Sequence, residues 1–181
     1  MVHTGRRKRE GNTVKSIGWL VLLMSLVSCA DFGERSGDGS GWALFRLADS
    51  SLTVYELRSV PLEKIALQKR PLITAADLTA YSWSTHSFTG RSRLDSVFSA
   101  LLLLRGHSRG LPFMVAVDGQ PVYLGSFWFA YSSIADPGCP YIMLPPVPPY
   151  RIQASPVGEI PDPRGDARVS EALSRAGILR P

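Results

Sequence analysis

Apolar and polar residues alternate most regularly near the middle of the chain. Phe113 to Val117 and Gln120 to Leu124 flank the pair Asp118-Gly119, which is the pattern of a β-hairpin closed by a two-residue type I′ turn. The turn sets the register, which pairs Val117 with Gln120, Ala116 with Pro121, Val115 with Val122, and Phe113 with Leu124. Because proline has no N–H to offer a further strand, the return strand should be an edge near the turn. Gly125 should introduce a bulge or bend.

A helix is expected from about Arg93 to Arg105, directly before this hairpin. Its apolar residues recur at the spacing of one helical face: Leu94, Val97, Phe98, Leu101 and Leu104. Ser92 with Asp95 gives a possible capping box, and Gly106 suits the position after the last turn. Because Leu101 to Leu104 make the last turn apolar on nearly all sides, we expect a sheet to cover this helix.

Shorter elements are expected before that helix. Two strands, Trp42 to Leu47 and Leu52 to Leu57, should form a hairpin around Asp49-Ser50-Ser51. Thr74 begins a short helix with a weak capping box to Asp77. Aromatic, β-branched and serine residues predict one strand from Tyr81 to Thr89, with Tyr81 and Trp83 on one face and His86 and Phe88 on the other. Residues 59–73, broken by two prolines, indicate no definite element.

The C-terminal part is rich in proline. Nine of the 14 prolines lie between Pro137 and Pro163, and residues 145–149 should be extended polyproline II. This segment is either a ligand for another domain or an arm laid over its own domain. A last helix is expected from Ala167 to Ala176, closed by Gly177. Together these elements predict one α+β domain over residues 42–181: a mainly antiparallel sheet with one apolar helix packed on a face, a proline-rich arm over residues 137–163, and a C-terminal helix.

Positive charge is concentrated at the start of the chain. Residues 1–28 hold five basic side chains and one acidic, a balance of +4, whereas the rest holds 15 basic and 14 acidic, a balance of +1. Nucleic-acid binding needs many Lys and Arg side chains that neutralise phosphates together, and the later part has no such cluster. Nucleic acid is therefore not an expected partner.

An apolar segment, Ile17 to Val27, follows the basic residues. It has the length of a signal-peptide core and is shorter than the ~20 residues that span a bilayer. The next residues, Leu26-Val27-Ser28-Cys29, resemble the lipobox of bacterial prolipoproteins, and the resemblance covers residues 1–29. It implies cleavage between Ser28 and Cys29 and attachment of a lipid to the Cys29 sulfur. The alternatives are a single-pass anchor, or a soluble protein with a buried N-terminal helix.

The lipobox resemblance implies where the protein resides. The chain would be held on the bacterial cell membrane or outer membrane through acylated Cys29, with its domain outside the cytoplasm. Residues 30–41 contain four glycines and two serines, so 29–41 reads as a flexible tether that reaches roughly 20 Å. Cys139 would then be left as a lone thiol, and an internal disulfide is not expected.

Motifs for catalysis are weak or missing. Gly106-His107-Ser108-Arg109-Gly110 matches the literal pattern of a nucleophile elbow. That elbow needs a strand before the serine and a helix after it, and the predicted order is the reverse. Structural zinc usually takes four Cys or His ligands. After acylation of Cys29 only three such side chains remain in the mature chain, and they are not clustered. We therefore expect no metal, no cofactor and no catalytic residues, with an envelope hydrolase as the alternative.

Aromatic residues offer a candidate binding surface. Trp83 and His86 lie on one predicted strand, and Tyr123 and Trp128 lie on or after the second hairpin. Neighbouring on a sheet, these four residues would form a groove for an envelope protein, peptide or glycan. The competing interpretation places most of them in the core, where large aromatics are common. The sequence thus favours a non-catalytic binding or assembly module of the cell envelope.

Overall fold

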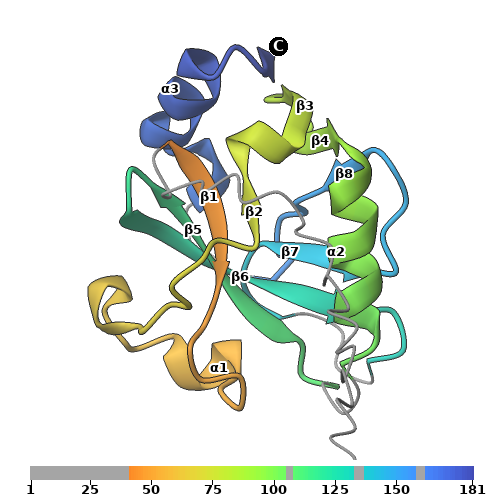
Figure 1. Ribbon diagram of the computed structural model, residues 1–181. Coiled ribbons are helices and arrows are strands. Elements are labelled where there is room, and N and C mark those ends of the chain that lie inside the picture. The colour runs from red at the N-terminus through yellow and green to blue at the C-terminus, as the bar shows by residue number, and fades with distance from the viewer. Residues whose placement is uncertain (1–40, 105–107, 133–136, 158–161) are drawn as a thin grey trace, which may run out of the picture. The chain divides into compact units, whose positions relative to one another are not determined.

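The computed structural model of the chain describes residues 41–104, 108–132, 137–157 and 162–181 (Figure 1). The expected signal peptide (1–28), the cleavage site Ser28–Cys29 and all of the tether before Gly41 lie outside these ranges, as do Gly106 and His107. Within the described ranges, no helix combines the length and the apolar character needed to cross a membrane.

Two β-sheets and three α-helices make up the described part of the chain. The helices are α1 (Val54–Leu57), α2 (Ser92–Leu102) and α3 (Ala167–Arg175). The larger sheet, ordered β2-β1-β5-β6-β7, consists of β1 (Trp42–Arg46), β2 (Ile73–Thr74), β5 (Leu111–Val117), β6 (Gln120–Phe129) and β7 (Tyr141–Leu144). The smaller sheet, ordered β8-β4-β3-β9, consists of β3 (Leu78–Ser82), β4 (Ser87–Gly90), β8 (Tyr150–Arg151) and β9 (Leu179–Arg180). Most strand pairs are antiparallel, and β6–β7 and β3–β9 are parallel. The predicted α+β class is confirmed.

Strands β5 and β6 form the predicted central hairpin. Asp118 and Gly119 have φ angles of 50° and 76°, both positive as a type I′ turn requires. The first two pairs of the predicted register are confirmed. Farther from the turn the predicted register is wrong by one residue, because a bulge makes Val115 face Tyr123 and Phe113 face Gly125. The bulge therefore precedes the predicted one at Gly125.

The position of β6 in the larger sheet agrees with its proline. Pro121 lies near the turn, whereas β6 pairs with β7 from Ser126 to Phe129. The strand is therefore an edge near the turn and an inner strand farther along. This satisfies the requirement that proline occupy a position whose missing N–H needs no partner.

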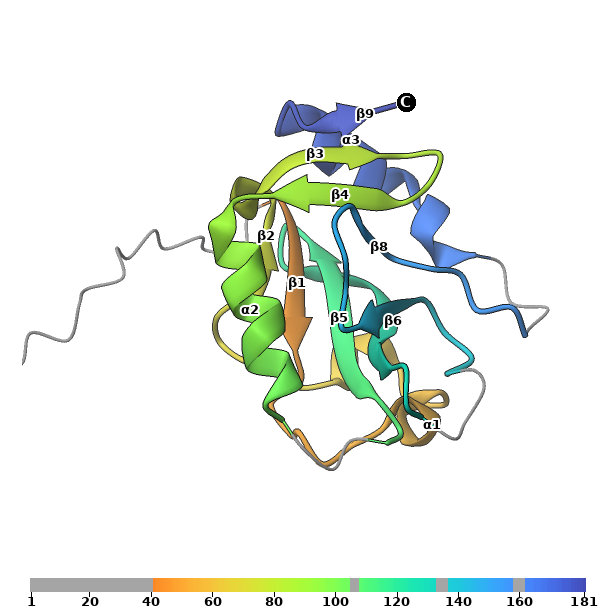
Figure 2. The ribbon, with the colours of Figure 1, turned by 90° about the vertical axis from the view of Figure 1, so that its right-hand side faces the viewer.

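The larger sheet is covered on both faces. One face carries Leu44, Val115 and Phe127 into the main core, which it shares with α2, α3 and the smaller sheet. The other face carries Met114, which packs with Leu57 of α1 and other apolar residues of the segment after β1. Strand β5 is accordingly buried along its whole length. Figures 1 and 2 show α2 and the smaller sheet on the first side and α1 on the other.

Helix α2 packs against the main core as predicted, but its ends differ from the prediction. Its buried residues, Leu94, Phe98 and Leu101, follow the predicted apolar face. The N-cap residue is Arg91 rather than Ser92, so the predicted capping box is absent. Leu102 and Leu103 are 41% and 79% exposed, so the last turn is not covered on all sides.

The predicted strand over residues 52–57 is wrong, because this segment contains α1. The side chain of Glu56 accepts hydrogen bonds from the backbone N–H of Thr53 at 2.7 Å and from its hydroxyl at 2.8 Å. This reciprocal cap satisfies donors at the helix start. The hairpin expected around Asp49-Ser50-Ser51 is therefore also wrong, since β1 pairs with β2 and β5 instead. The chain does turn there, and the Asp49 carboxylate accepts from the backbone N–H of Ser51 at 2.9 Å.

A second capping box confirms the one predicted at Thr74, where the Asp77 carboxylate accepts from the Thr74 backbone N–H at 2.8 Å. The element that it caps is a single 3-10 turn, Ala75–Asp77, which leads into β3.

The proline-rich segment is an arm packed on its own domain. It contributes β7 and β8 to the two sheets, and residues 145–149 between them contain bends rather than the expected continuous polyproline II helix. Tyr150 and Ile152 are 4% and 0% exposed. The C-terminal helix is confirmed as α3, and Gly177, with φ of 71°, follows it in the left-handed conformation that favours glycine at this position. The chain then ends in β9 beside β3.

Candidate functional site

The candidate site is built on the turn between β3 and β4. The prediction of one strand from Tyr81 to Thr89 is wrong, because residues 83–86 form a turn and the two halves pair as a hairpin. The Thr85 hydroxyl holds the turn through contacts with the hydroxyls of Ser82 at 3.0 Å and Ser87 at 2.7 Å. His86 has φ of 48°, a left-handed conformation that histidine adopts more readily than most residues.

The hairpin gathers aromatic rings that the predicted strand placed on opposite faces. The ring centroids of Trp83 and His86 are 5.2 Å apart, and Tyr81 lies 6.4 Å from Trp83 and 6.2 Å from His86. Phe88 stacks on Tyr81 at 6.3 Å. Tyr81 and Phe88 are buried, whereas Trp83 and His86 are half-buried. The predicted separation of these rings is therefore wrong, and the pair Trp83–His86 lies where a buried cluster reaches the surface.

An open pocket of about 310 Å³ adjoins His86. Its lining residues come from three parts of the chain: Ser84, Thr85 and His86; Arg151, Gln153 and Ala154; and Arg164. Pairing of β4 with β8, in which Ser87 faces Arg151, brings the first two parts together. Figure 2 shows β8 beside β4, with the C-terminal part of the chain close by. No carboxylate is among the lining residues.

The two arginines of the pocket differ in their surroundings. Arg164 forms an ion pair with Asp162 at 2.5 Å, and its Nη1 donates to the carbonyl of Ile152 at 2.6 Å. Hydrogen bonds from Arg164 lower the pKa of Asp162. Arg151 is exposed and donates through Nε to the carbonyl of Thr85 at 3.1 Å. Arg164 thus fixes the wall of the pocket, and Arg151 makes no ion pair with any described residue.

His86 is held by a buried phenol. The Tyr81 hydroxyl lies 3.2 Å from Nδ1 of His86. Because Tyr81 is fully buried and this is the one hydrogen bond of its hydroxyl within the described residues, the phenol donates to Nδ1. Burial lowers the pKa of His86, and the charge of Arg164 acts in the same direction. The neutral ring therefore carries its hydrogen on Nε2, where it is a donor.

Two of the four predicted surface residues belong to the core. Tyr123 is 3% exposed and Trp128 is 2% exposed. Tyr123 lies in the main core with Tyr81, whereas Trp128 alternates with Phe127 and Phe129 along β6 and so points to the opposite face of the sheet. The four residues thus do not form one groove: Trp83 and His86 reach the surface, and Tyr123 and Trp128 do not.

The hydroxyl of Tyr123 is an unusual feature of this core. It is buried, and it makes no hydrogen bond within the part of the chain that the structure describes. Burial raises the pKa of Tyr123 well above its ordinary value; Tyr81 and Asp162 act weakly in the same direction, and the charge of Arg164 opposes them.

Residues suited to a metal ion do not come together in the described ranges, where no group of three or more His, Cys, Asp or Glu side chains has a suitable arrangement. The nearest chemistry is that of the pocket, whose side chains are suited to hydrogen bonding with a polar ligand. Sequence reasoning named His86 and Trp83 and missed Arg151, Gln153 and Arg164. These three lie in or beside the proline-rich segment, where no local pattern distinguishes them.

Comparison of the chain with family models, with curated proteins and with solved structures found no match.

Proposed function

We propose that this chain is a non-catalytic binding module of the bacterial cell envelope, held on a membrane through a lipid on Cys29, and that it binds at the pocket beside Trp83 and His86. The anchor rests on the order of basic residues, apolar segment and Leu26-Val27-Ser28-Cys29 at the start of the chain. Each methylene of an acyl chain that is buried in the bilayer stabilises membrane attachment by about 0.8 kcal/mol, and stable anchoring needs more than one chain.

The address of the anchored domain is the cell membrane or the outer membrane, outside the cytoplasm. Ala30 follows the modified cysteine, with Asp31 one position later, so the residue after Cys29 is not an acidic one. The tether of residues 29–41 would keep the domain within roughly 20 Å of the lipid surface. This short reach suits a partner that is itself part of the envelope.

The observation that carries the binding function is the pocket. A neutral histidine, an amide and an arginine that makes no ion pair with any described residue line one open volume of about 310 Å³, and the half-buried ring of Trp83 lies next to the ring of His86. Ligand sites characteristically combine an aromatic wall with a few convergent polar groups. Elsewhere on this hairpin the aromatic side chains are buried in the core. Trp83 and His86 are thus the aromatic side chains of the hairpin that a ligand can reach.

A hydrolase acting on envelope polymers is the competing function. Such an enzyme would use a histidine to activate a hydroxyl or a water molecule. The Nδ1 of His86 is engaged by the phenol of Tyr81, which leaves Nε2 as a donor and not as a base. This arrangement favours binding over catalysis at this histidine.

Two measurements test the proposal. Mass spectrometry of the protein purified from membranes should show a chain that begins at Cys29 and carries fatty acyl mass. A product that begins at Met1, or that lacks acyl mass, would refute the anchor.

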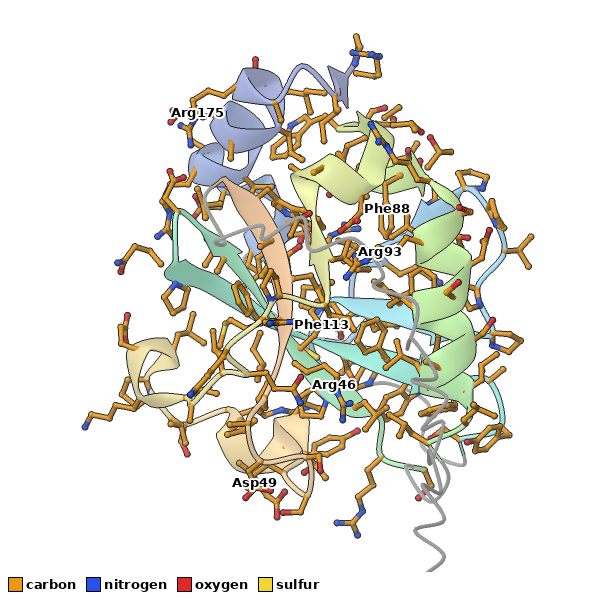
Figure 3. All side chains as sticks on the ribbon, viewed as in Figure 1. Arg46, Asp49, Phe88, Arg93, Phe113 and Arg175 are labelled. Atoms are coloured by element: carbon orange, nitrogen blue, oxygen red, sulfur yellow. The ribbon has the colours of Figure 1, made fainter. Side chains whose placement is uncertain are left out.

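Pull-down from solubilised envelopes tests the binding role. The wild-type chain should enrich a component above both a Cys29→Ala control, which lacks the sulfur that carries the lipid, and a Trp83→Ala variant. Arg175→Ala serves as the matched surface control, since Arg175 lies on α3 (Figure 3) and pairs with Asp118 outside the pocket. Equal enrichment by the wild type and the Trp83→Ala variant would place the binding surface elsewhere.

A further inference from the structure

We infer that the ligand of this pocket is an acidic sugar residue, whose carboxylate binds Arg151 and whose hydroxyls accept hydrogen bonds from His86 and Gln153. This inference rests on the proposed binding function and specifies the ligand. Three features of the pocket lead to it: the kind of hydrogen-bonding groups that remain unused, the charge that remains uncompensated, and the state of the surrounding backbone.

The unused groups of the lining are mainly donors. The Nε2–H of His86 is a donor because Nδ1 accepts from Tyr81. The side-chain oxygen of Gln153 accepts from the Tyr141 hydroxyl at 3.2 Å, so its NH₂ group remains for a ligand. Arg151 uses Nε on Thr85, which leaves both terminal nitrogens. A pocket rich in donors is complementary to a ligand rich in acceptors.

The charge of the pocket matches a single negative charge. Of the two arginines, Arg164 is neutralised by Asp162, and His86 is neutral. Arg151, which pairs with no acidic side chain among the described residues, therefore supplies one positive charge, and its terminal nitrogens have the fork geometry that binds a carboxylate through two hydrogen bonds. A phosphate monoester carries about −1.5 to −2 at neutral pH, which exceeds what the pocket offers.

Several backbone groups beside the pocket are already hydrogen-bonded. Ile152 donates its N–H to the carbonyl of His86 at 3.0 Å, and its own carbonyl accepts from Arg164. Gln153 exchanges both of its backbone hydrogen bonds with Tyr141, at 2.9 and 2.7 Å. Addition of an extended peptide as a further strand needs free N–H and C=O groups. At Ile152 and Gln153 the pocket therefore offers side chains rather than backbone groups, as suits the hydroxyls and carboxylate of a sugar.

The remaining features fit a ring of this size. The half-buried ring of Trp83 does not itself line the pocket, but its centroid lies 5.2 Å from that of His86, which does. A volume of about 310 Å³ is at the lower end for small-molecule sites. The pocket thus holds one sugar residue, and further residues of a chain would extend over the surface.

The test is isothermal titration calorimetry on the full lipidated chain, purified in a detergent without a sugar headgroup. The probes are glucuronate, glucose, glucose 6-phosphate and the dipeptide alanyl-alanine. Glucuronate should bind with a Kd on the order of 1 mM, as expected for a single small residue. Glucose should bind at least tenfold more weakly, and neither the phosphate nor the dipeptide should exceed glucuronate.

Variants identify the site of binding. Arg151→Gln should weaken glucuronate binding about tenfold or more, and Arg151→Lys, which keeps the charge but not the fork, should recover part of the loss. Arg175→Gln makes the same change of charge on α3 and should leave affinity unchanged. Because Arg151 is exposed, both of its variants should give the wild-type circular dichroism spectrum.

Each other outcome overturns the inference. These outcomes are no heat with glucuronate at tens of millimolar, equal affinity for the wild type and Arg151→Gln, and tighter binding of the phosphate or the dipeptide. None of them bears on the pull-down comparison of wild type and Trp83→Ala. Capture that depends on Trp83 without glucuronate binding would leave the proposed function standing and remove the acidic sugar.

Discussion

Tyr123 gives a stability prediction whose sign is unusual for a buried residue. Its hydroxyl is buried, and among the described residues it has no hydrogen-bond partner. Burying a hydroxyl without a partner costs about 1–3 kcal/mol in proteins. Tyr123→Phe keeps the ring and removes that oxygen, while some packing contacts of the oxygen are also lost. We expect the free energy of unfolding to rise by about 1–2 kcal/mol.

Tyr150 provides a matched change of opposite sign. Its ring is also buried, at 4% exposure, but its hydroxyl donates to the carboxylate of Asp95. A hydrogen bond to a charged group contributes about 1.5–3 kcal/mol, and the exposure of Asp95 favours the low end. Tyr150→Phe should therefore lower the free energy of unfolding by about 1.5 kcal/mol, although the chemical change is the same.

Urea denaturation followed by far-UV circular dichroism compares the two variants with the wild type. The slope of the free energy against urea should be unchanged, so that a shift in midpoint reports stability. The reasoning is refuted when Tyr123→Phe lowers the free energy of unfolding by 1 kcal/mol or more, because such a decrease would mean that the hydroxyl makes a favourable interaction in the folded protein in solution.

Two more predictions concern packing and pH. A Cβ on Gly125 would lie 2.4 Å from two ring carbons of Phe113 and 2.8 Å from the carbonyl oxygen of Pro140, so Gly125→Ala should destabilise the fold by about 3 kcal/mol. Gly165→Ala, where nothing lies within 4 Å, should stay within about 0.5 kcal/mol of the wild type; equal effects of the two changes would contradict this packing. For His86, burial lowers the pKa in the folded state, so as pH falls through about 6.5 the unfolded chain takes up a proton that the folded chain resists. The free energy of unfolding should therefore decrease as the pH is lowered through that window. The His86→Gln variant, measured by the same urea midpoints, should show a smaller decrease. An identical pH dependence of the two proteins would show that another group is responsible.

Local signals in the sequence predicted much of the fold. The pair Asp118-Gly119 predicted the central hairpin, because few residue pairs favour two positive φ angles. The spacing of apolar residues predicted the buried face of α2, and Gly177 marked the end of α3. Each of these depends on residues within one or two turns of one another. The bulge at Val122 could not be predicted in this way, since the packing of both Val122 and Tyr123 into one core produces it.

Errors arose where a turn or cap lacked its usual residues or was overlooked. The turn at residues 83–86 contains no Gly, Pro, Asn or Asp, so nothing interrupted the strand pattern there. Thr53 and Glu56, in contrast, have the spacing of a capping box, and this signal would have predicted α1. The β-branched and aromatic residues of the same segment favoured a strand, and the helix cap and burial of Leu57 outweigh that preference.

The candidate site depends on contacts between segments about 65 residues apart, yet the core specifies it. Strand β8 pairs with β4 so that Tyr150 faces Phe88 and Arg151 faces Ser87. Tyr150 and Ile152 are buried on either side of Arg151, at 4% and 0% exposure. A slip of one residue would turn Arg151 into the core and expose its two apolar neighbours, at a cost of about 1.5–3 kcal/mol for each large side chain exposed. The register that buries Tyr150 and Ile152 is therefore the register that presents Arg151 beside His86, and packing alone assembles the pocket.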